Sequence, residues 1–201
     1  MMNRDLLLYV VHGGFWASFG VAGVLVKQGE QALPGGQSNP PVAAGTATAS
    51  FSRSILALHF LAFGVLYFGL GNSIVPDRVQ EWIGGQRIIG AAIIMAGAAV
   101  MGWARISFQS WRFRAKLDEG HQLATGGPFR YIRHPIYMGL NLLALGSAVW
   151  DPTFLTWTAV GLMVLGSDLR GRAEERLLGA AYGETYLAYM QRTKRFLPGV
   201  Y

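Results

Sequence analysis

Cysteine is absent from this chain of 201 residues, and charged residues are scarce. Without cysteine, the chain can form no disulfide, no thiolate zinc site and no cysteine nucleophile. Charged residues make up only 14% of the chain, whereas hydrophobic residues make up 52%. The apolar residues occur in long uninterrupted runs, which favours a polytopic membrane protein over one or two soluble domains.

Acidic residues are also few, with 11 Asp and Glu against 17 Lys and Arg, which gives a net charge of +6. Such an excess could indicate nucleic-acid binding, but in a membrane protein clustered Lys and Arg more often mark cytoplasmic loops. Six basic residues lie in Arg105–Arg133 and six in Arg170–Arg195. We therefore predict that these two segments are cytoplasmic, that the N-terminus lies outside and that no nucleic acid is bound.

Three apolar segments are long enough to cross a bilayer as helices, at about 1.5 Å per residue. They are Leu6–Val26, Ile55–Val75 and Ile83–Ala104. Between the first two, residues 27–53 are rich in Gly, Pro and small polar residues, which predicts a loop. The third segment carries small residues that would let another helix approach closely, namely Gly90, Gly97, Ala98 and Gly102.

Two shorter apolar segments, Ile136–Trp150 and Phe154–Gly166, follow and are separated by Asp151 and Pro152. Fifteen helical residues reach about 22 Å, less than a hydrocarbon core of about 30 Å. They are either two thin or tilted spans or a helical hairpin that dips in and returns, with both outer ends on one side. The predicted fold is therefore all-α and polytopic, with about five transmembrane helices and a charged cytoplasmic helix after Asp168.

Two histidines, His12 and His59, lie within the first two predicted spans. A haem held by both is the obvious hypothesis, because an ionisable group inside a membrane is often functional. The two spans are antiparallel, however, and place the imidazoles about 15 Å apart in depth, too far to bind one iron. We therefore predict neutral histidines that form hydrogen bonds between helices, and no metal site.

The segment "HQLATGGPFRYIRHP" places turn glycines, imidazoles and guanidinium groups next to the predicted hairpin. Gly126 and Gly127 permit a tight turn that brings backbone N–H groups close to a ligand. Pro135 is suited to the first turn of a helix, whose free N–H groups and positive dipole end favour an anion. The residues alone leave two interpretations equally open, a carboxylate or phosphate site and a loop that binds lipid headgroups.

The segment after Asp168 carries a second pattern. At helical spacing, one face of this segment begins with the carboxylate of Glu175 and continues with apolar and aromatic side chains. Its residues are Glu175, Leu178, Tyr182, Tyr186 and Tyr189. A carboxylate on a buried stripe usually has a partner or a role, although an interfacial helix with an exposed carboxylate is the alternative. Glu174 should instead face Arg170, one turn earlier. We expect the tyrosines to pack against the hairpin rather than to form a cofactor cage.

Two motifs in this part of the chain resemble a known family. "HQLATGGPFRYIRHPIYMG" and "EERLLGAAYGETYLAYMQRTKRFLP" are similar to the paired motifs of integral membrane methyltransferases of the isoprenylcysteine carboxyl methyltransferase and phospholipid methyltransferase type. The resemblance covers about Arg105–Pro198 and does not include the first two spans. It divides the chain into N-terminal transmembrane helices at 1–104 and a cofactor-binding core at 105–201.

The resemblance implies an S-adenosylmethionine-dependent methyltransferase that acts on a small lipophilic or lipid-like acceptor and releases S-adenosylhomocysteine. It implies a cofactor site at His121, Leu123, Gly127, Tyr131, Arg133, His134, Pro135 and Tyr137. Arg170 with Glu174 or Glu175 would face the acceptor. An acceptor carboxylate or thiolate would need no strong base, whereas an amine or hydroxyl would make Glu175 the candidate base.

Two other functions remain open at this stage. A sterol-reductase-like enzyme that binds NADPH resembles the C-terminal half, but such proteins are usually longer and have more spans. A membrane sensor or assembly protein could keep the same fold without catalysis. The sequence indicates neither the oligomeric state nor the role of residues 27–53.

Overall fold

The computed structural model describes residues 4–31, 46–72, 84–107 and 123–201. Within these ranges the chain forms six α-helices, one short 3-10 helix and no strand. The elements are α1 (Arg4–Gln31), α2 (Thr46–Gly71), α4 (Gly84–Ser107), η1 (Gly127–Arg130), α5 (Pro135–Trp150), α6 (Phe154–Tyr182) and α7 (Glu184–Arg192). The all-α prediction is confirmed for the described residues.

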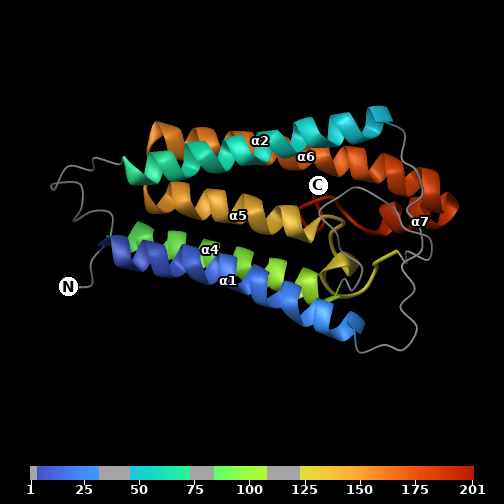
Figure 1. Ribbon diagram of the computed structural model, residues 1–201, viewed down its shortest axis with the longest axis horizontal. Coiled ribbons are helices and arrows are strands. Elements are labelled where there is room, and N and C mark those ends of the chain that lie inside the picture. Colours follow the sequence, from blue (N-terminus) through green and yellow to red (C-terminus); the bar gives the residue numbers. More distant parts are fainter. Residues whose placement is uncertain (1–3, 32–45, 73–83, 108–122) are drawn as a thin grey trace.

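The five long helices lie side by side and alternate in direction, as Figure 1 shows. Helix α5 occupies the centre, where it packs against α4 on one side and α6 on the other. Helix α1 covers α4, and α2 covers α6. The start of α5, η1 and α7 all lie at the same end of the bundle (Figure 1). The two motifs singled out in the sequence are therefore brought together at one end.

Several predicted boundaries are wrong. The expected loop at 27–53 is helical at both ends, because α1 continues to Gln31 and α2 begins at Thr46; its middle lies outside the described residues. Lys27–Gln31 and Thr46–Arg53 contain no proline, so nothing there interrupts a helix. The expected short segment Phe154–Gly166 is the first half of the 29-residue helix α6, which continues through Asp168 without a helix-breaking proline.

The prediction of one continuous aromatic stripe is also wrong in part, because helix α6 ends at Tyr182. Gly183 has a φ of +52° and separates α6 from α7. Such a backbone angle is easily adopted only by glycine, so the chain turns here. Glu175, Tyr186 and Tyr189 are nevertheless buried, whereas Tyr182 is half-buried. The turn brings α7 back against the end of α6.

Glycine allows α4 and α5 to pack closely. A Cβ atom on Gly90 would stand 2.6 Å from the carbonyl oxygen of Gly146, and one on Gly97 would stand 2.8 Å from that of Gly139. The two contacts are seven residues apart on both helices, so they recur after two turns of the antiparallel pair. The predicted close approach is confirmed at Gly90 and Gly97, whereas Gly102 has open space around it.

His12 and His59, the two histidines within the predicted spans, form hydrogen bonds to residues of other helices, as predicted. His12 of α1 has Tyr67 Oη at 3.3 Å from Nδ1 and Ser147 Oγ at 3.2 Å from Nε2. His59 of α2 has Ser167 Oγ of α6 at 3.4 Å from Nε2. Each histidine thus links its N-terminal helix to the α5–α6 pair.

Among the described residues, one helix is both long and apolar enough to cross a membrane, at Gly85–Ser107. Three shorter apolar helical segments accompany it, Leu6–Ser18, Leu56–Gly71 and Pro135–Trp150. Large apolar side chains are exposed along the outer helices, among them Phe60, Phe68, Ile88, Trp157 and Leu165. The bundle therefore presents an apolar surface around its sides.

We predict that Gly97→Ala destabilises the bundle by about 1–3 kcal/mol, because the added methyl group overlaps the backbone of α5. Gly102→Ala on the same helix is the matched control; it should be neutral or slightly stabilising, since alanine favours helix and meets no atom there. Thermal unfolding of both variants in detergent checks this prediction, and equal melting temperatures would contradict it.

Candidate functional site

The loop before α5 is held in place by a glycine that no other residue could replace without strain. Gly127 has a φ of +56°, and a Cβ there would stand 2.2 Å from Ser107 Oγ of α4. After it, the chain forms the 3-10 turn η1, closed by a hydrogen bond from Phe129 N–H to the Gly126 carbonyl. The predicted tight turn is therefore present, and it seats the loop on the end of α4.

The C-terminal segment runs beside this loop as a short parallel bridge between Ile132 and Lys194. The N–H of Arg133 donates to the Lys194 carbonyl at 2.7 Å, and the N–H of His134 donates to the Arg195 carbonyl at 3.1 Å. Pro135 then begins α5, where its missing N–H costs nothing. The bridge thus fixes Arg133 and His134 just before α5 and next to the C-terminal half of α6.

Glu175 of α6 is the centre of a buried ionic cluster and is only 7% exposed. Its Oε1 accepts from Arg133 Nε at 2.8 Å and from Arg195 Nε at 3.0 Å, and its Oε2 accepts from Arg195 Nη2 at 2.6 Å. Arg133 also donates to the carbonyls of Met190 and Thr193. Three segments distant in sequence are joined through this one carboxylate.

Glu174, the preceding residue, has a separate set of partners. Its Oε1 accepts from the Tyr137 hydroxyl and from Arg170 Nε, the latter at 3.3 Å. The Arg170–Glu174 pair one turn apart was predicted from spacing and is confirmed. The Arg170 guanidinium also lies over the Tyr137 ring, 5.7 Å from its centroid.

His134 lies between the two carboxylates. Its Nδ1 is 3.5 Å from Glu174 Oε2, and its Nε2 is 3.4 Å from Glu175 Oε1. Burial by itself lowers the pKa of His134, but the two carboxylates outweigh burial and raise that pKa above its usual value. Burial likewise raises the pKa of Glu175, yet His134, Arg195 and Arg133 hold that pKa well below its usual range. The cluster therefore favours an imidazolium between two carboxylates.

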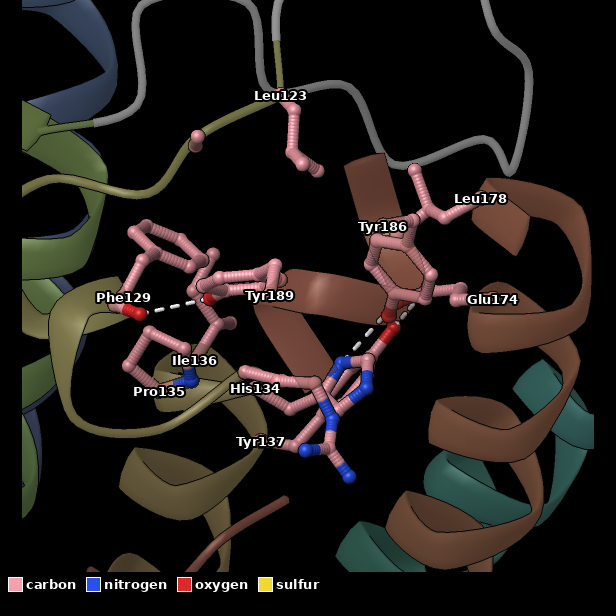
Figure 2. A pocket seen from close by; sticks show the side chains of 12 residues that line it. Leu123, Phe129, His134, Pro135, Ile136, Tyr137, Glu174, Leu178, Tyr186 and Tyr189 are labelled. Carbon is pink, nitrogen blue, oxygen red and sulfur yellow. Dashed lines mark hydrogen bonds and ion pairs between the residues drawn. The ribbon is translucent and has the colours of Figure 1, made fainter. Parts of the chain in front are cut away.

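A small cavity of about 100 Å³ opens beside Glu174 and His134. Figure 2 shows Glu174 and Leu178 of α6 on one side, Phe129, Pro135 and Ile136 on the other, and Tyr186 and Tyr189 of α7 between them. The Tyr189 hydroxyl donates to the Phe129 carbonyl at 2.7 Å. Burial raises the pKa of Tyr189 to about 12, which keeps this hydroxyl a neutral donor. The lining combines aromatic rings, a carboxylate and an imidazole.

The structure gathers most of the residues predicted from the sequence. Five of the eight expected cofactor positions line this cavity, Leu123, Arg133, His134, Pro135 and Tyr137, and Glu174 joins them. Gly127 and Tyr131 do not line it, since Gly127 packs on α4 and Tyr131 is 54% exposed. Arg170 and Glu175 lie behind the lining, each bonded to lining residues. His121 lies outside the described residues.

Sequence reasoning missed several residues of the site. Phe129 was not singled out, and Tyr186 and Tyr189 were expected to pack against the hairpin although they line the cavity. Arg195 was counted among the basic residues without a role, yet it binds Glu175 with two nitrogens and Asp168 with a third. Its place in "RFLP" was the available signal. Its partner in α6 is twenty residues away and could not be identified from spacing.

Within the described part of the chain, no group of three or more His, Asp or Glu side chains could hold a metal ion. The site contains ion pairs, an imidazole and aromatic rings. Such a set can hold an organic cation against a carboxylate and ring faces, and a carboxylate against guanidinium or imidazolium groups.

The fold and the site together define an all-helical protein with a charged, aromatic cavity at one end of an apolar bundle. A sequence model of the phospholipid methyltransferase family matches residues 86–185, which are 100 of the 201 residues. This part of the chain is therefore similar to that family. The match begins in α4 and includes the loop before α5, both carboxylates and the start of α7.

One curated relative is the protein-S-isoprenylcysteine O-methyltransferase of Schizosaccharomyces pombe, which is 28% identical over 155 residues. The alignment covers 74% of this chain and 59% of the relative. The chain therefore matches less than two thirds of that relative's length. The family resemblance inferred from the two motifs is confirmed.

We predict that His134→Gln reduces stability by about 1–3 kcal/mol more at pH 6 than at pH 9, because it removes the ion pairs of the imidazolium with both glutamates. The sign follows from the raised pKa: stabilisation by His134 is complete below about 6.5 and is lost as pH rises through the folded-state pKa. Chemical unfolding of both proteins across this range measures the gap. A gap that does not change with pH would contradict the prediction.

Proposed function

We propose that this protein is an integral membrane methyltransferase that transfers a methyl group from S-adenosylmethionine to a lipid-like acceptor. The family match and the named activity of the yeast relative support this function. The observation that carries the proposal is the cavity itself. Five of the cofactor positions implied by the family resemblance line it, together with Glu174. Phe129, Tyr186 and Tyr189, which were not among the predicted cofactor residues, complete the lining.

The lining is chemically suited to the cofactor. S-adenosylmethionine supplies a methyl group on a sulfonium, and it also carries an amino-acid carboxylate. The Glu174 carboxylate and the rings of Tyr137, Tyr186 and Tyr189 would favour the sulfonium. Protonated His134, together with Arg133, would favour the carboxylate. At about 100 Å³, the cavity is below the 300–1,000 Å³ typical of ligand pockets, so it would hold one end of the molecule.

The structure supports different roles for the two glutamates. Glu174 lines the cavity, whereas Glu175 lies behind it and is bonded to two guanidinium groups. A general base needs a pKa near the working pH, but His134, Arg195 and Arg133 hold the pKa of Glu175 far below that range. We therefore assign Glu174 to ligand contact and Glu175 to positioning, in place of the base role that the sequence suggested for Glu175.

These charges favour an acceptor that is already a nucleophile. The pKa of Glu174 is also lowered, by His134, Arg170 and Tyr137 acting against burial. Neither carboxylate is thus suited to remove a proton from an amine or hydroxyl. A carboxylate or thiolate needs no such base, and Arg170, next to Glu174, could orient it. Catalysis would then rest on positioning two reactants in line and excluding water.

We further propose that the bundle spans the membrane about five times, with the site and C-terminus on the cytoplasmic side. The exposed apolar side chains along the outer helices support burial in lipid. The described parts of the basic segments that flank α5 and the first half of α6, namely the end of α4, η1, the second half of α6 and α7, lie at the same end as the cavity, which is the distribution expected of a cytoplasmic face. A lipid-like acceptor could then reach the site from the bilayer.

Ligand-induced stabilisation tests the cofactor. S-adenosylhomocysteine should raise the melting temperature of the purified protein in a concentration-dependent way, because it binds only the folded state. NADPH, the ligand of the sterol-reductase alternative, should leave the melting temperature unchanged. Stabilisation by NADPH alone would rule out the methyltransferase.

A pair of glutamate variants tests the two roles. Glu174→Gln should weaken S-adenosylmethionine binding about tenfold or more while keeping most of the stability, because it removes the carboxylate that would favour the sulfonium. Glu175→Gln should mainly lower stability, by about 1–3 kcal/mol, since it weakens the bonds to Arg133 and Arg195. Isothermal titration and unfolding measure both effects, and the reverse pattern would refute the assignment.

A further inference from the structure

A second group of ionic contacts is built around Asp168 of α6, and the proposed chemistry does not use it. Asp168 Oδ1 accepts from Arg195 Nη1 at 2.9 Å and from the Tyr201 hydroxyl at 2.8 Å, and its Oδ2 accepts from Arg172 Nε at 2.6 Å. We call these four residues the outer cluster: Asp168, Arg172, Arg195 and Tyr201. None of them lines the cavity beside Glu174.

Arg195 belongs to the outer cluster and to the buried cluster of Glu175 at the same time. Its Nε and Nη2 donate to Glu175, whereas its Nη1 donates to Asp168 and, at 2.6 Å, to the Tyr201 hydroxyl. A guanidinium group is planar and rigid, so partners on one edge fix the direction of the other nitrogens. The contacts to Asp168 and Tyr201 therefore determine how Arg195 meets Glu175.

The Tyr201 hydroxyl uses its full hydrogen-bonding capacity in the outer cluster. It donates to Asp168 and accepts from Arg195 and, at 3.1 Å, from Arg172 Nη2. A hydroxyl group can donate once and accept twice, so all three of its positions are occupied. The chain turns back to make these contacts, because the Phe196 N–H donates to the Tyr201 carbonyl at 2.7 Å. The turn thus brings the Tyr201 side chain onto α6.

Stability alone does not explain the outer cluster. The side chains of Asp168 and Arg172 are 22% and 53% exposed, and exposed ion pairs contribute only about 0–1 kcal/mol. Burial raises the pKa of Asp168, but hydrogen bonds from Arg172 and Tyr201 outweigh burial and lower that pKa, so the carboxylate stays charged. What a lasting charge at Asp168 does supply is a fixed direction for the Arg195 guanidinium.

Arg195 and His134 both pack against α6 at Gly171. A Cβ on Gly171 would stand 3.3 Å from His134 Cδ2 and 3.5 Å from Arg195 Cδ, so both side chains lie directly against the helix backbone. His134 Nε2 is also 3.4 Å from Glu175 Oε1, the oxygen that accepts from Arg195 Nε. Closely packed groups transmit small displacements. A shift of Arg195 would therefore move Glu175 and the His134 ring, which lines the cavity.

We propose that Asp168 and Tyr201 are positioning residues for the methyl-donor site. They hold Arg195, which orients Glu175 and His134, and His134 is the lining residue proposed to favour the carboxylate of the donor. Neither Asp168 nor Tyr201 touches the donor, so they act only through Arg195. The inference rests on the proposed function, and it extends the site to the chain segment at 195–201.

Two variants remove these contacts one at a time. Asp168→Asn removes the charge beside Arg195, and Tyr201→Phe removes only the hydroxyl. Each has a matched control: Glu184→Gln removes one negative charge at the start of α7, and Tyr9→Phe removes one phenol hydroxyl on α1. All four side chains are at least partly exposed, so none of the changes leaves a cavity in the core.

The probe is S-adenosylhomocysteine, which carries the same amino-acid carboxylate as the donor, titrated by calorimetry into the full-length protein in detergent. Asp168→Asn and Tyr201→Phe should each weaken its binding at least about threefold, within the range of couplings between residues of one hydrogen-bond network. Glu184→Gln and Tyr9→Phe should leave binding within about twofold of the unmodified protein. Equal affinities of the test variants and their controls would overturn the proposal.

Arg195→Lys shows whether the effect passes through Arg195. The lysine keeps a positive charge near Glu175, but its single ammonium lacks the planar fork that meets two carboxylates. In this background, Asp168→Asn and Tyr201→Phe should change the affinity by less than about twofold more, because the side chain that they orient is gone. A further loss as large as in the unmodified protein would show that they do not act through Arg195, and would overturn the proposal.

The Nε–H group of Arg195 gives a readout that needs no ligand. It donates to Glu175, so its proton should exchange slowly with water in nuclear magnetic resonance spectra, and Arg195→Lys identifies the signal by removing it. Asp168→Asn and Tyr201→Phe should speed this exchange at least about threefold, because they loosen the ion pair locally, and the two controls should not. Unchanged exchange would overturn the proposal. If S-adenosylhomocysteine did not bind the unmodified protein, the proposed function would fail, and this exchange rate would still decide whether Asp168 and Tyr201 hold Arg195.

Discussion

The buried ion pairs of Glu175 with Arg133 and Arg195 hold the functional end of the molecule together. Arg133 comes from the loop before α5, Glu175 from α6 and Arg195 from the C-terminal segment. A buried carboxylate is costly unless its partners compensate it, so removal of either arginine would leave an expensive charge behind. The two backbone hydrogen bonds from Arg133 and His134 to the C-terminal segment add a second link between the same parts. The position of His134, and hence of the cavity wall, depends on this junction.

Adjacent glutamates have different surroundings because successive residues of a helix point about 100° apart. Glu175 faces the junction and is satisfied by guanidinium groups, whereas Glu174 faces Tyr137, Arg170 and the cavity. His134 contacts both and couples their charges. A single turn of α6 thus supplies both the carboxylate that stabilises the fold and the carboxylate available to a ligand.

Packing of the helices determines where the cavity beside Glu174 lies. Reciprocal glycine contacts bring α5 against α4, and the start of α5 then presents Tyr137 to the cavity. Helix α6 packs on another side of α5 and supplies Glu174 and Leu178 to the same cavity. In the proposed enzyme this arrangement would place the methyl donor at one end of the apolar bundle.

The motif residues that line the cavity were implied by the family resemblance, whereas the sequence by itself determined the all-helical class, the close glycine contacts of α4 at Gly90 and Gly97, the turn at Gly127 and the pairing of Arg170 with Glu174. These features follow from local rules: apolar length, backbone freedom at glycine, the fit of proline to a helix start and spacing of four residues between Arg170 and Glu174. Only the tertiary structure decided that α6 runs unbroken through Asp168, that Gly183 turns α7 back, and that Arg195 pairs with Glu175. Those outcomes depend on contacts between residues far apart in the chain. Burial of the Glu175 carboxylate requires a partner that compensates its charge, but the sequence does not specify which residue that partner is. Periodicity could place Glu175 on a buried face, but the arginines that satisfy it became known only from the fold.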